Sequence, residues 1–295
     1  FDKSKNYDLN IIFVFEDNMS AIGRAIDRGP AFDDIKISIN NKVMSGKAGS
    51  RNIFTSKLYD RSYYFVGLGK KNELTTQTFE KCLNTALKEI NRYKMSTISI
   101  DLTNIKIKNF NLLRGSIVEI EKAQYVYNKS SKTSLKQCGL KLSLTFETKQ
   151  FNQIILESLA ISNGINKARM LGDTPSNICN PTFLAKEAKK LEKINKNIRV
   201  EILDEKQMSA LKMGSLLSVS RGSKQPAKLV IIKYMPIKKK QPIVLVGKGI
   251  TFDTGGISLK PSANMDEMKY DMSGAGSVIG TMQACAEMSL KNNVI

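Results

Sequence analysis

The chain has 295 residues, of which 41% are hydrophobic, so it is long enough for two domains with cores of ordinary size. It contains no histidine, which excludes a Ser-His-Asp triad, a Cys-His pair and the HExxH zinc motif within these residues. No apolar run approaches the roughly 18 residues of a membrane span, and no basic and then apolar leader opens the sequence. We therefore expect a soluble cytoplasmic protein without membrane contact.

The net charge of +19 is large, but the basic residues are spread over both halves of the chain. The lysines at 238–240 are expected to form a solvated turn. Lysine far outnumbers arginine, whereas phosphate recognition favours arginine, although the charge would still attract nucleic acid without sequence preference. Four dispersed cysteines show no metal-binding spacing and are expected to be buried, reduced thiols: Cys82, Cys138, Cys179 and Cys285.

In the first half of the chain, apolar or alternating runs take turns with segments of helical spacing, which predicts an α/β domain. Strands are predicted at 8–15, 35–39, 63–68, 97–102 and 140–146, and helices at 74–93 and 111–127. The third strand ends in GLGKK at 67–71. Such a loop could bind phosphate, but a single GxG is weak evidence, and a turn that ends the strand is the simpler interpretation.

A polar stretch at 145–152 is interpreted as a linker, which places the two domains at 1–148 and 149–295. Thr182 is the expected N-cap of a helix in the second domain. Small residues at 274–276 and 280 would let the last helix pack closely onto a sheet. In this domain, helices are predicted at 152–170, 182–194, 206–213 and 273–288, and strands at 198–203, 214–219, 229–234 and 243–246.

The stretch VGKGITFDTGGISLKPSANMDEMKYD at 246–271 follows the last of these strands, which is apolar and predicted to be buried. It places Lys248, Asp253, Lys260 and Asp271 close together in sequence, on backbone rich in turns. Taken singly, charged residues in such a loop are mostly solvated. Together, two carboxylates and two amines could form a cation site, because carboxylate oxygens suit Mg, Mn and Zn. Spacing by itself leaves both interpretations open.

The same stretch resembles the metal-binding signature of the leucine aminopeptidase family, almost residue by residue over 246–276. Upstream, ARMLGDTPSNICNPTFLA at 168–185 and DEKQMSALKMGSLLSVSRGSKQPAKLVIIKY at 204–234 resemble the lead-in to the family's catalytic domain. The resemblance implies an N-terminal α/β domain followed by a larger α/β metallopeptidase domain with a mixed central sheet flanked by helices. It also implies an aminopeptidase that removes N-terminal residues, leucine among them, from peptides.

The resemblance assigns a role to each residue of the stretch that matches the family motif. Asp253 resembles the carboxylate that bridges two divalent metal ions, Mn or Zn, and Asp271 resembles a ligand of the more tightly held ion. Lys248 is similar to the family's lysine ligand, which binds metal only as a neutral amine. Lys260 resembles the catalytic lysine, which as a cation would polarise the scissile carbonyl. Met268 matches a residue that lines the pocket for the substrate's first side chain, and its alternative is a core position.

One departure from the family concerns the rest of the site. The family's downstream motif Asn-Thr-Asp-Ala-Glu-Gly-Arg supplies two more acidic ligands and an arginine that holds bicarbonate, and the sequence reaches Ile295 without it. We therefore expect the chain to be the first part of a longer enzyme, with only part of the site present.

Three functions follow from these observations. The favoured one is a two-metal aminopeptidase that acts on peptides with a free N-terminus and, by resemblance, forms a homohexamer with bicarbonate at its site. Some bacterial members of the family are accessory DNA-binding proteins, which the net charge of +19 would suit. A non-catalytic role for a truncated homologue is the third, and only the missing ligands support it.

Overall fold

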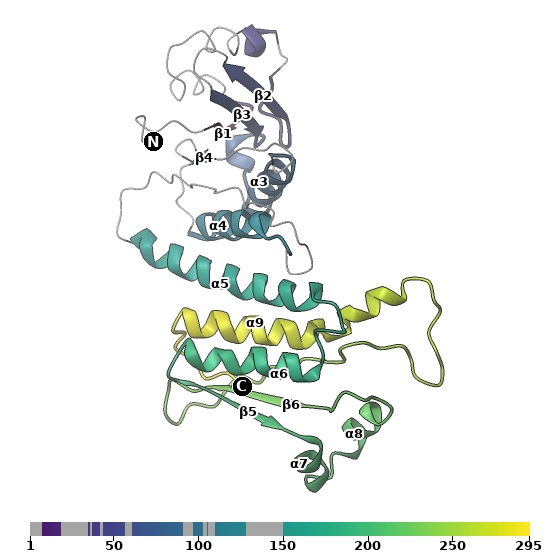
Figure 1. The fold of residues 1–295 in the computed structure, drawn as a ribbon. Helices are drawn as coiled ribbons and strands as arrows, with labels where there is room; N and C mark the ends of the chain where they lie inside the picture. The colour runs from purple at the N-terminus through teal and green to yellow at the C-terminus, as the bar shows by residue number, and fades with distance from the viewer. Residues whose placement is uncertain are drawn as a thin grey trace. The chain divides into compact units, whose positions relative to one another are not determined.

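The structure is a computed structural model that describes residues 8–18, 35, 37–41, 44–56, 61–90, 97–102, 105, 110–127 and 150–295. The chain divides into two compact units, and the main division falls between Ser158 and Leu159, inside the long helix α5 (Gln150–Asp173). Both units combine strands with helices, as Figure 1 shows. The predicted α/β fold class is therefore confirmed.

A four-stranded sheet with the order β2-β3-β1-β4 forms the centre of the first unit. β1 (Leu9–Val14) pairs in parallel with both β3 (Arg61–Gly67) and β4 (Ile98–Asp101). β2 (Arg51–Ser56) pairs with β3 in the antiparallel direction and forms one edge. The sheet is thus mixed, and α3 (Thr76–Ile90) connects β3 to β4, which run in the same direction.

Both faces of β1 are buried, which explains why its sequence, LNIIFV, is apolar except for the buried Asn10. Ile11 and Phe13 pack in a core to which α3 (Thr76–Ile90) and α4 (Phe110–Gln124) also contribute. The intervening Ile12 belongs to a second cluster, since alternate residues of a strand point to opposite faces. The apolar face of α3 recurs every three or four residues and lies against the first of these cores.

The strand predicted at 35–39 is wrong, because Ile35 and residues 37–40 are helical. The pattern IKISI spaces its apolar residues two and four apart, so it fits either period. Ile35 is buried and Ile39 packs against the same cluster, whereas Ile37 between them is 56% exposed. This is the four-residue spacing of one helix face.

The other strands and helices predicted for this unit are confirmed wherever the structure describes the residues, whereas residues 150–152 of the predicted linker already belong to α5. The strands at 8–15, 63–68 and 97–102 correspond to β1, β3 and β4, and the two predicted helices correspond to α3 and α4. Sequence patterning does not predict β2, whose side chains are mostly polar. The strand predicted at 140–146 and most of the linker at 145–152 lie outside the described residues.

The GLGKK loop after β3 is a turn whose amide groups are already used inside the protein. The amide N–H of Gly69 donates to the carbonyl oxygen of Gly46 at 2.7 Å, and that of Lys71 donates to the carboxylate of Asp17 at 3.3 Å. Anion sites need amide groups that are free to donate, and a carboxylate at the same place repels phosphate. The structure therefore favours the turn over a phosphate site.

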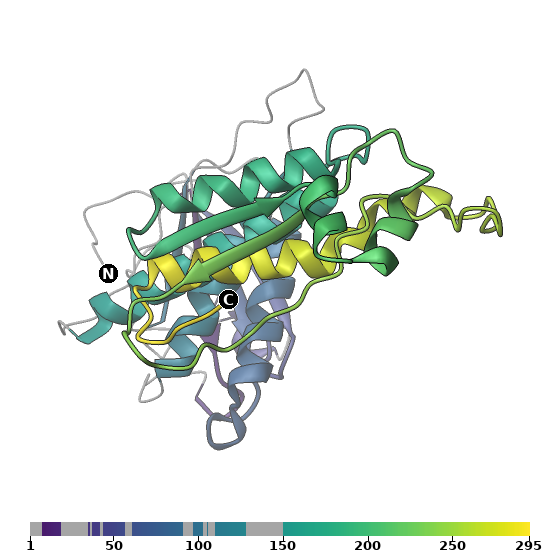
Figure 2. The ribbon, with the colours of Figure 1, turned by 90° about the horizontal axis from the view of Figure 1, so that it is seen from below.

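The second unit packs helices over an antiparallel pair of strands, β5 (Ile198–Leu203) and β6 (Leu229–Tyr234). Helices α6 (Pro181–Lys189) and α9 (Ser273–Glu287) cover one face of this pair (Figures 1 and 2). Residues 159–173 of α5 lie along α9 on the side away from the strands (Figure 1). The helices and the strands share one core that includes the fully buried Tyr234.

Strand pairing in the second unit is mixed, because Val294 bridges Tyr234 in the antiparallel and Ile243 in the parallel direction. The segment predicted as a buried strand at 243–246 does lie in extended pairing there, with the amide N–H of Ile295 donating to the carbonyl oxygen of Ile243 at 2.9 Å. Its burial is not observed, because Val246 is 91% exposed. An apolar run predicts burial only when another element covers it, and no described residue covers Val246.

Two further predictions for the second unit are wrong. The strand predicted at 214–219 is the helix α8 (Gly214–Ser220). Leu217 of this helix and Met213, the N-cap residue four positions earlier, pack against one small cluster. The N-cap of α6 is Asn180 rather than Thr182. Its side-chain oxygen accepts from a backbone amide in the first turn at 3.0 Å, and a proline occupies the first helical position.

The other elements of this unit are confirmed: α5, α6, α9, β5 and β6, together with α7 (Glu205–Ala210). Residues 238–240 form an exposed turn, as predicted. Three cysteines are buried, and Cys138 lies outside the described residues. Within the part of the chain that the structure describes, no helix has both the length and the apolar character needed to cross a membrane.

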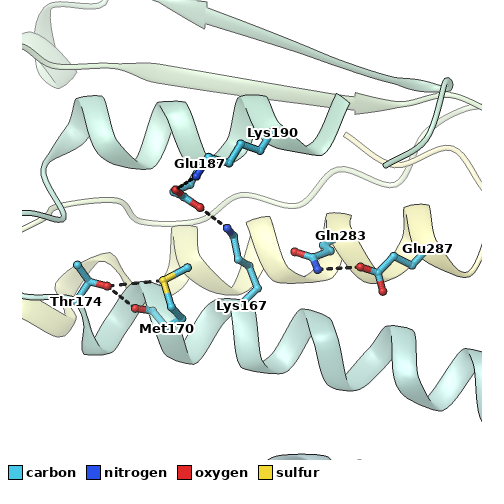
Figure 3. Close-up of polar contacts among 7 residues, drawn as sticks. All are labelled: Lys167, Met170, Thr174, Glu187, Lys190, Gln283 and Glu287. Atoms are coloured by element: carbon cyan, nitrogen blue, oxygen red, sulfur yellow. Dashed lines mark hydrogen bonds and ion pairs between the residues drawn. The ribbon is translucent and has the colours of Figure 1, made fainter. Parts of the chain in front are cut away.

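A buried carboxylate connects helices of the second unit (Figure 3). Glu187 on α6, whose side chain is 7% exposed, accepts hydrogen bonds from Lys167 on α5 and from Lys190 just after α6. At the end of α5 the hydroxyl of Thr174 donates to the carbonyl oxygen of Met170 at 2.6 Å, which satisfies a carbonyl of the last turn.

The Glu187 contact predicts a dependence of stability on pH. Burial by itself would raise the pKa of Glu187, but the hydrogen bonds and charges of Lys167 and Lys190 outweigh it and lower the pKa below the ordinary value of 4.5. A carboxyl of this kind stabilises the fold fully above its unfolded-state pKa, and the contribution is lost as the pH falls through the folded-state pKa. We expect the free energy of unfolding to decrease below about pH 4.5, and Glu187→Gln to reduce that decrease.

Urea unfolding of the wild type and of Glu187→Gln at pH 7 and below pH 4 measures this effect. At pH 7 the variant should lose about 1–3 kcal/mol, because two lysines lose a charged acceptor. Glu201→Gln is the matched control, since the ion pair of Glu201 with Lys233 is exposed on both sides and should change stability by less than about 1 kcal/mol. The same pH profile in wild type and Glu187→Gln would contradict the assignment.

Candidate metal and catalytic site

The loop that leads into the 3-10 helix η4 (Met265–Met272) extends away from the helices of the second unit (Figures 1 and 2). Its start is fixed against α9, because the amide N–H of Ala275 donates to the carbonyl oxygen of Lys248 at 2.8 Å. A Cβ at Gly247 would lie 2.5 Å from the carbonyl oxygen of Gly274, so a glycine is needed for this close approach. The first turn of α9 therefore sets the position of Lys248.

A tight turn brings Asp253 and Lys260 together. The carboxylate of Asp253 accepts from the amide N–H of Gly255 at 3.0 Å, and Gly255 has a φ of +91°, which favours glycine. After the turn, the amide N–H of Lys260 donates to the carbonyl oxygen of Thr254 at 2.9 Å. The backbone therefore returns the side chain of Lys260 to that of Asp253.

Asp271, in the last turn of η4, completes the group. The ammonium nitrogen of Lys260 lies 3.1 Å from a carboxylate oxygen of Asp253 and 3.4 Å from one of Asp271. The ammonium nitrogen of Lys248 lies 3.9 Å from the same oxygen of Asp271. The structure thus brings together all four charged residues that sequence analysis singled out, from three separate stretches of backbone.

The charges at this group stabilise one another. The amide N–H of Gly255 and then the ammonium of Lys260 hold the pKa of Asp253 below its usual range. The hydrogen bond to Asp253, reinforced by Asp271, raises the pKa of Lys260. The carboxylate of Asp253 is therefore ionised and Lys260 is a cation at neutral pH.

Met268 faces Lys260 rather than a hydrophobic core. The sulfur of Met268 lies 3.1 Å from the ammonium nitrogen of Lys260 and accepts a hydrogen bond from it. Met268 belongs to none of the hydrophobic clusters formed by the described residues. The sequence does not predict this contact, because no pattern of residue spacing indicates that a methionine accepts a hydrogen bond from a lysine.

The four charged residues can be tested for their fit to a metal ion. The ammonium of Lys260 stands where two carboxylates converge, which is a position that suits a cation. Two carboxylate oxygens and the amine of Lys248 are donors that Mn and Zn accept. Among the described residues, no three His, Cys, Asp or Glu side chains gather closely enough to hold a metal. The donor types therefore fit, and a full coordination shell requires further ligands.

Comparison with known sequences identifies the family. The sequence model of the N-terminal domain of the cytosol aminopeptidase family matches residues 11–134, and that of its catalytic domain matches residues 166–295. This chain belongs to that family. The result confirms the resemblance seen in the sequence, and the candidate site lies within the part that matches the catalytic domain.

Curated relatives carry the name "Probable cytosol aminopeptidase". One from Nitrosococcus oceani is 43% identical over 240 residues, which cover 78% of this chain and 48% of the relative. Another, from Dechloromonas aromatica, is 42% identical over 300 residues, which cover 96% of this chain and 59% of the relative. The chain thus spans about half the length of the curated relatives it matches. Neither of these names mentions DNA, so they give no support to the DNA-binding alternative.

Two solved structures share the fold. A mutant of tomato leucine aminopeptidase aligns with a TM-score of 0.78 at 23% identity, covering 100% of this chain and 59% of that one. The bottromycin maturation enzyme BotP in complex with Mn aligns with a TM-score of 0.78 at 22% identity, covering 98% and 58%. At these identities the likeness concerns the fold.

Proposed function

We propose that the protein is a metal-dependent aminopeptidase that removes N-terminal residues, leucine among them, from peptides. The observation that carries this proposal is the convergence of two carboxylates and two lysines within the part that matches the family's catalytic domain. Membership of the cytosol aminopeptidase family supports the same reaction class.

Lys248, Asp253 and Asp271 would hold the metal, and by resemblance to the family motif Asp253 would be the carboxylate shared by two ions of Mn or Zn. When bound, such a pair of ions supplies an activated water and binding positions for a free α-amine and a carbonyl oxygen. Lys260 is not a ligand in this proposal. As a cation next to the metal ligands, it could use an N–H to stabilise negative charge that develops on the carbonyl oxygen of the substrate.

The remaining parts of the proposal follow the family resemblance. Two further acidic ligands and an arginine that holds bicarbonate would complete the site. We also propose a cytoplasmic homohexamer, for which light scattering of the purified protein provides a direct test. Selectivity for unblocked peptides would follow from binding of the free α-amine at the metal.

Metal removal tests the proposed function. We expect dialysis against a chelator to reduce hydrolysis of leucine p-nitroanilide by at least about 100-fold, and addition of Mn or Zn to restore it. Asp253→Asn should stay inactive after metal is added, because the bridging carboxylate is lost. Asp266→Asn, which alters another acidic residue of η4, is the matched control and should respond like the wild type. A rate of hydrolysis that dialysis against the chelator does not reduce would refute the proposal.

A further inference from the structure

The ammonium of Lys260 has three N–H donors, and three side-chain acceptors surround it. Two are carboxylate oxygens, of Asp253 at 3.1 Å and of Asp271 at 3.4 Å. The third is the sulfur of Met268 at 3.1 Å. Each N–H of the ammonium can therefore have one protein acceptor, and these contacts fix the direction of all three.

These three acceptors differ in strength and in their affinity for metal. A carboxylate accepts a strong, charge-assisted hydrogen bond, whereas a thioether sulfur is a weak acceptor. Carboxylates also attract the ions for which this donor set is suited, while a thioether prefers soft ions such as Cu(I). When the carboxylates serve as metal ligands, Met268 is thus the one of the three acceptors that stays available to Lys260.

We propose that Met268 is a positioning residue that directs one N–H of Lys260 to the place of the substrate's carbonyl oxygen. The inference rests on the proposed function. The weak contact to sulfur holds the side chain of Lys260 in place before substrate arrives. A carbonyl oxygen is a stronger acceptor and replaces the sulfur at small cost, so the ammonium needs little reorientation during the reaction. This role is separate from lining a pocket for the substrate side chain.

Steady-state kinetics of Met268→Leu separate the two roles in the full-length, metal-loaded protein. Leucine keeps a similar volume but cannot accept a hydrogen bond. We expect kcat to fall about 10- to 100-fold, by the same factor for leucyl and alanyl substrates. KM should stay within about twofold, because binding of the ground state is unchanged. An effect confined to KM, or one that depends on the substrate's side chain, would assign Met268 to the pocket alone and overturn the proposal.

Met265→Leu is the matched control, since it makes the same substitution in η4 at a residue outside the Lys260 contact. Met268→Gln is a second variant in case Met268→Leu is poorly folded. The amide oxygen of glutamine is a stronger acceptor than sulfur, so it should keep the hydrogen bond from Lys260 and withhold that N–H from the substrate. We therefore expect kcat to fall again while the circular dichroism spectrum stays native. Wild-type kcat in Met268→Gln would contradict the proposed role.

A second readout does not depend on turnover. With methyl-¹³C methionine in the full-length protein, the Met268 resonance is assigned by its loss in Met268→Leu. We expect Lys260→Ala to shift this resonance and Lys269→Ala to leave it in place, because it is the ammonium of Lys260 that donates to the sulfur. An unshifted resonance in Lys260→Ala would refute the contact. Failure of the wild type to hydrolyse peptides would instead refute the proposed function, so the two failures are distinguishable.

Discussion

Lys260→Ala should reduce kcat for leucine p-nitroanilide by about 10²- to 10³-fold, which is the loss expected when a donor to a developing oxyanion is removed. The ammonium of Lys260 lies 3.1 Å and 3.4 Å from the carboxylates of Asp253 and Asp271, so it stands next to the proposed metal ligands. Alanine supplies neither charge nor donor. Stopped assays at saturating metal and substrate measure the change.

Measuring the affinity for metal distinguishes a catalytic role of Lys260 from a role as a metal ligand. Since Lys260 neutralises Asp253 and Asp271, its removal leaves two carboxylates without their shared cation. Affinity for Mn, measured by titration calorimetry, should therefore be unchanged or higher in Lys260→Ala. Lys269→Ala, which alters the next lysine along the chain, in η4, is the control and should keep wild-type turnover. Near-normal turnover in Lys260→Ala would remove the catalytic role, and loss of Mn binding would make Lys260 part of the metal shell.

The charged residues of the site could be singled out from the sequence because they are close together in the chain, and the family resemblance rather than their spacing assigned their roles. Lys248, Asp253, Lys260 and Asp271 lie on one turn-rich stretch, and the structure brings them together. The contact between Lys260 and the sulfur of Met268 could not be predicted, because it depends on how η4 is oriented after the turn. A methionine carries no charge or periodicity that would indicate a hydrogen-bond partner.

The errors in the fold arise where a short pattern fits two periods or depends on distant elements. Residues 35–39 and 214–219 are short apolar segments that fit a strand or a helix, and packing against other elements selects the helix. The exposure of Val246 depends on what covers it, which local sequence does not specify. Long segments with a consistent period, such as α3 and α9, are predicted nearly to their ends.

Gly280→Ala should destabilise the second unit by about 3 kcal/mol, near the upper end of the cost of overpacking. The sequence predicts that the small residues of α9 pack onto a sheet, but Gly280 instead faces Gly164 of α5. A Cβ at Gly280 would overlap the carbonyl oxygen of Gly164, and one at Gly164 would lie 2.5 Å from the carbonyl oxygen of Gly280. Backbone cannot move aside as a flexible side chain can, so the two helices must separate.

Urea unfolding measures this loss, and Gly222→Ala is its control because a Cβ there meets nothing within 4 Å. The control should stay within about 0.5 kcal/mol of the wild type. The consequence extends to the site, because the first turn of α9 holds the carbonyl oxygen of Lys248 through Ala275. Separation of α9 from α5 should therefore also weaken Mn binding, although Gly280 contacts no proposed ligand. Wild-type stability in Gly280→Ala would show that the helices do not meet at these glycines.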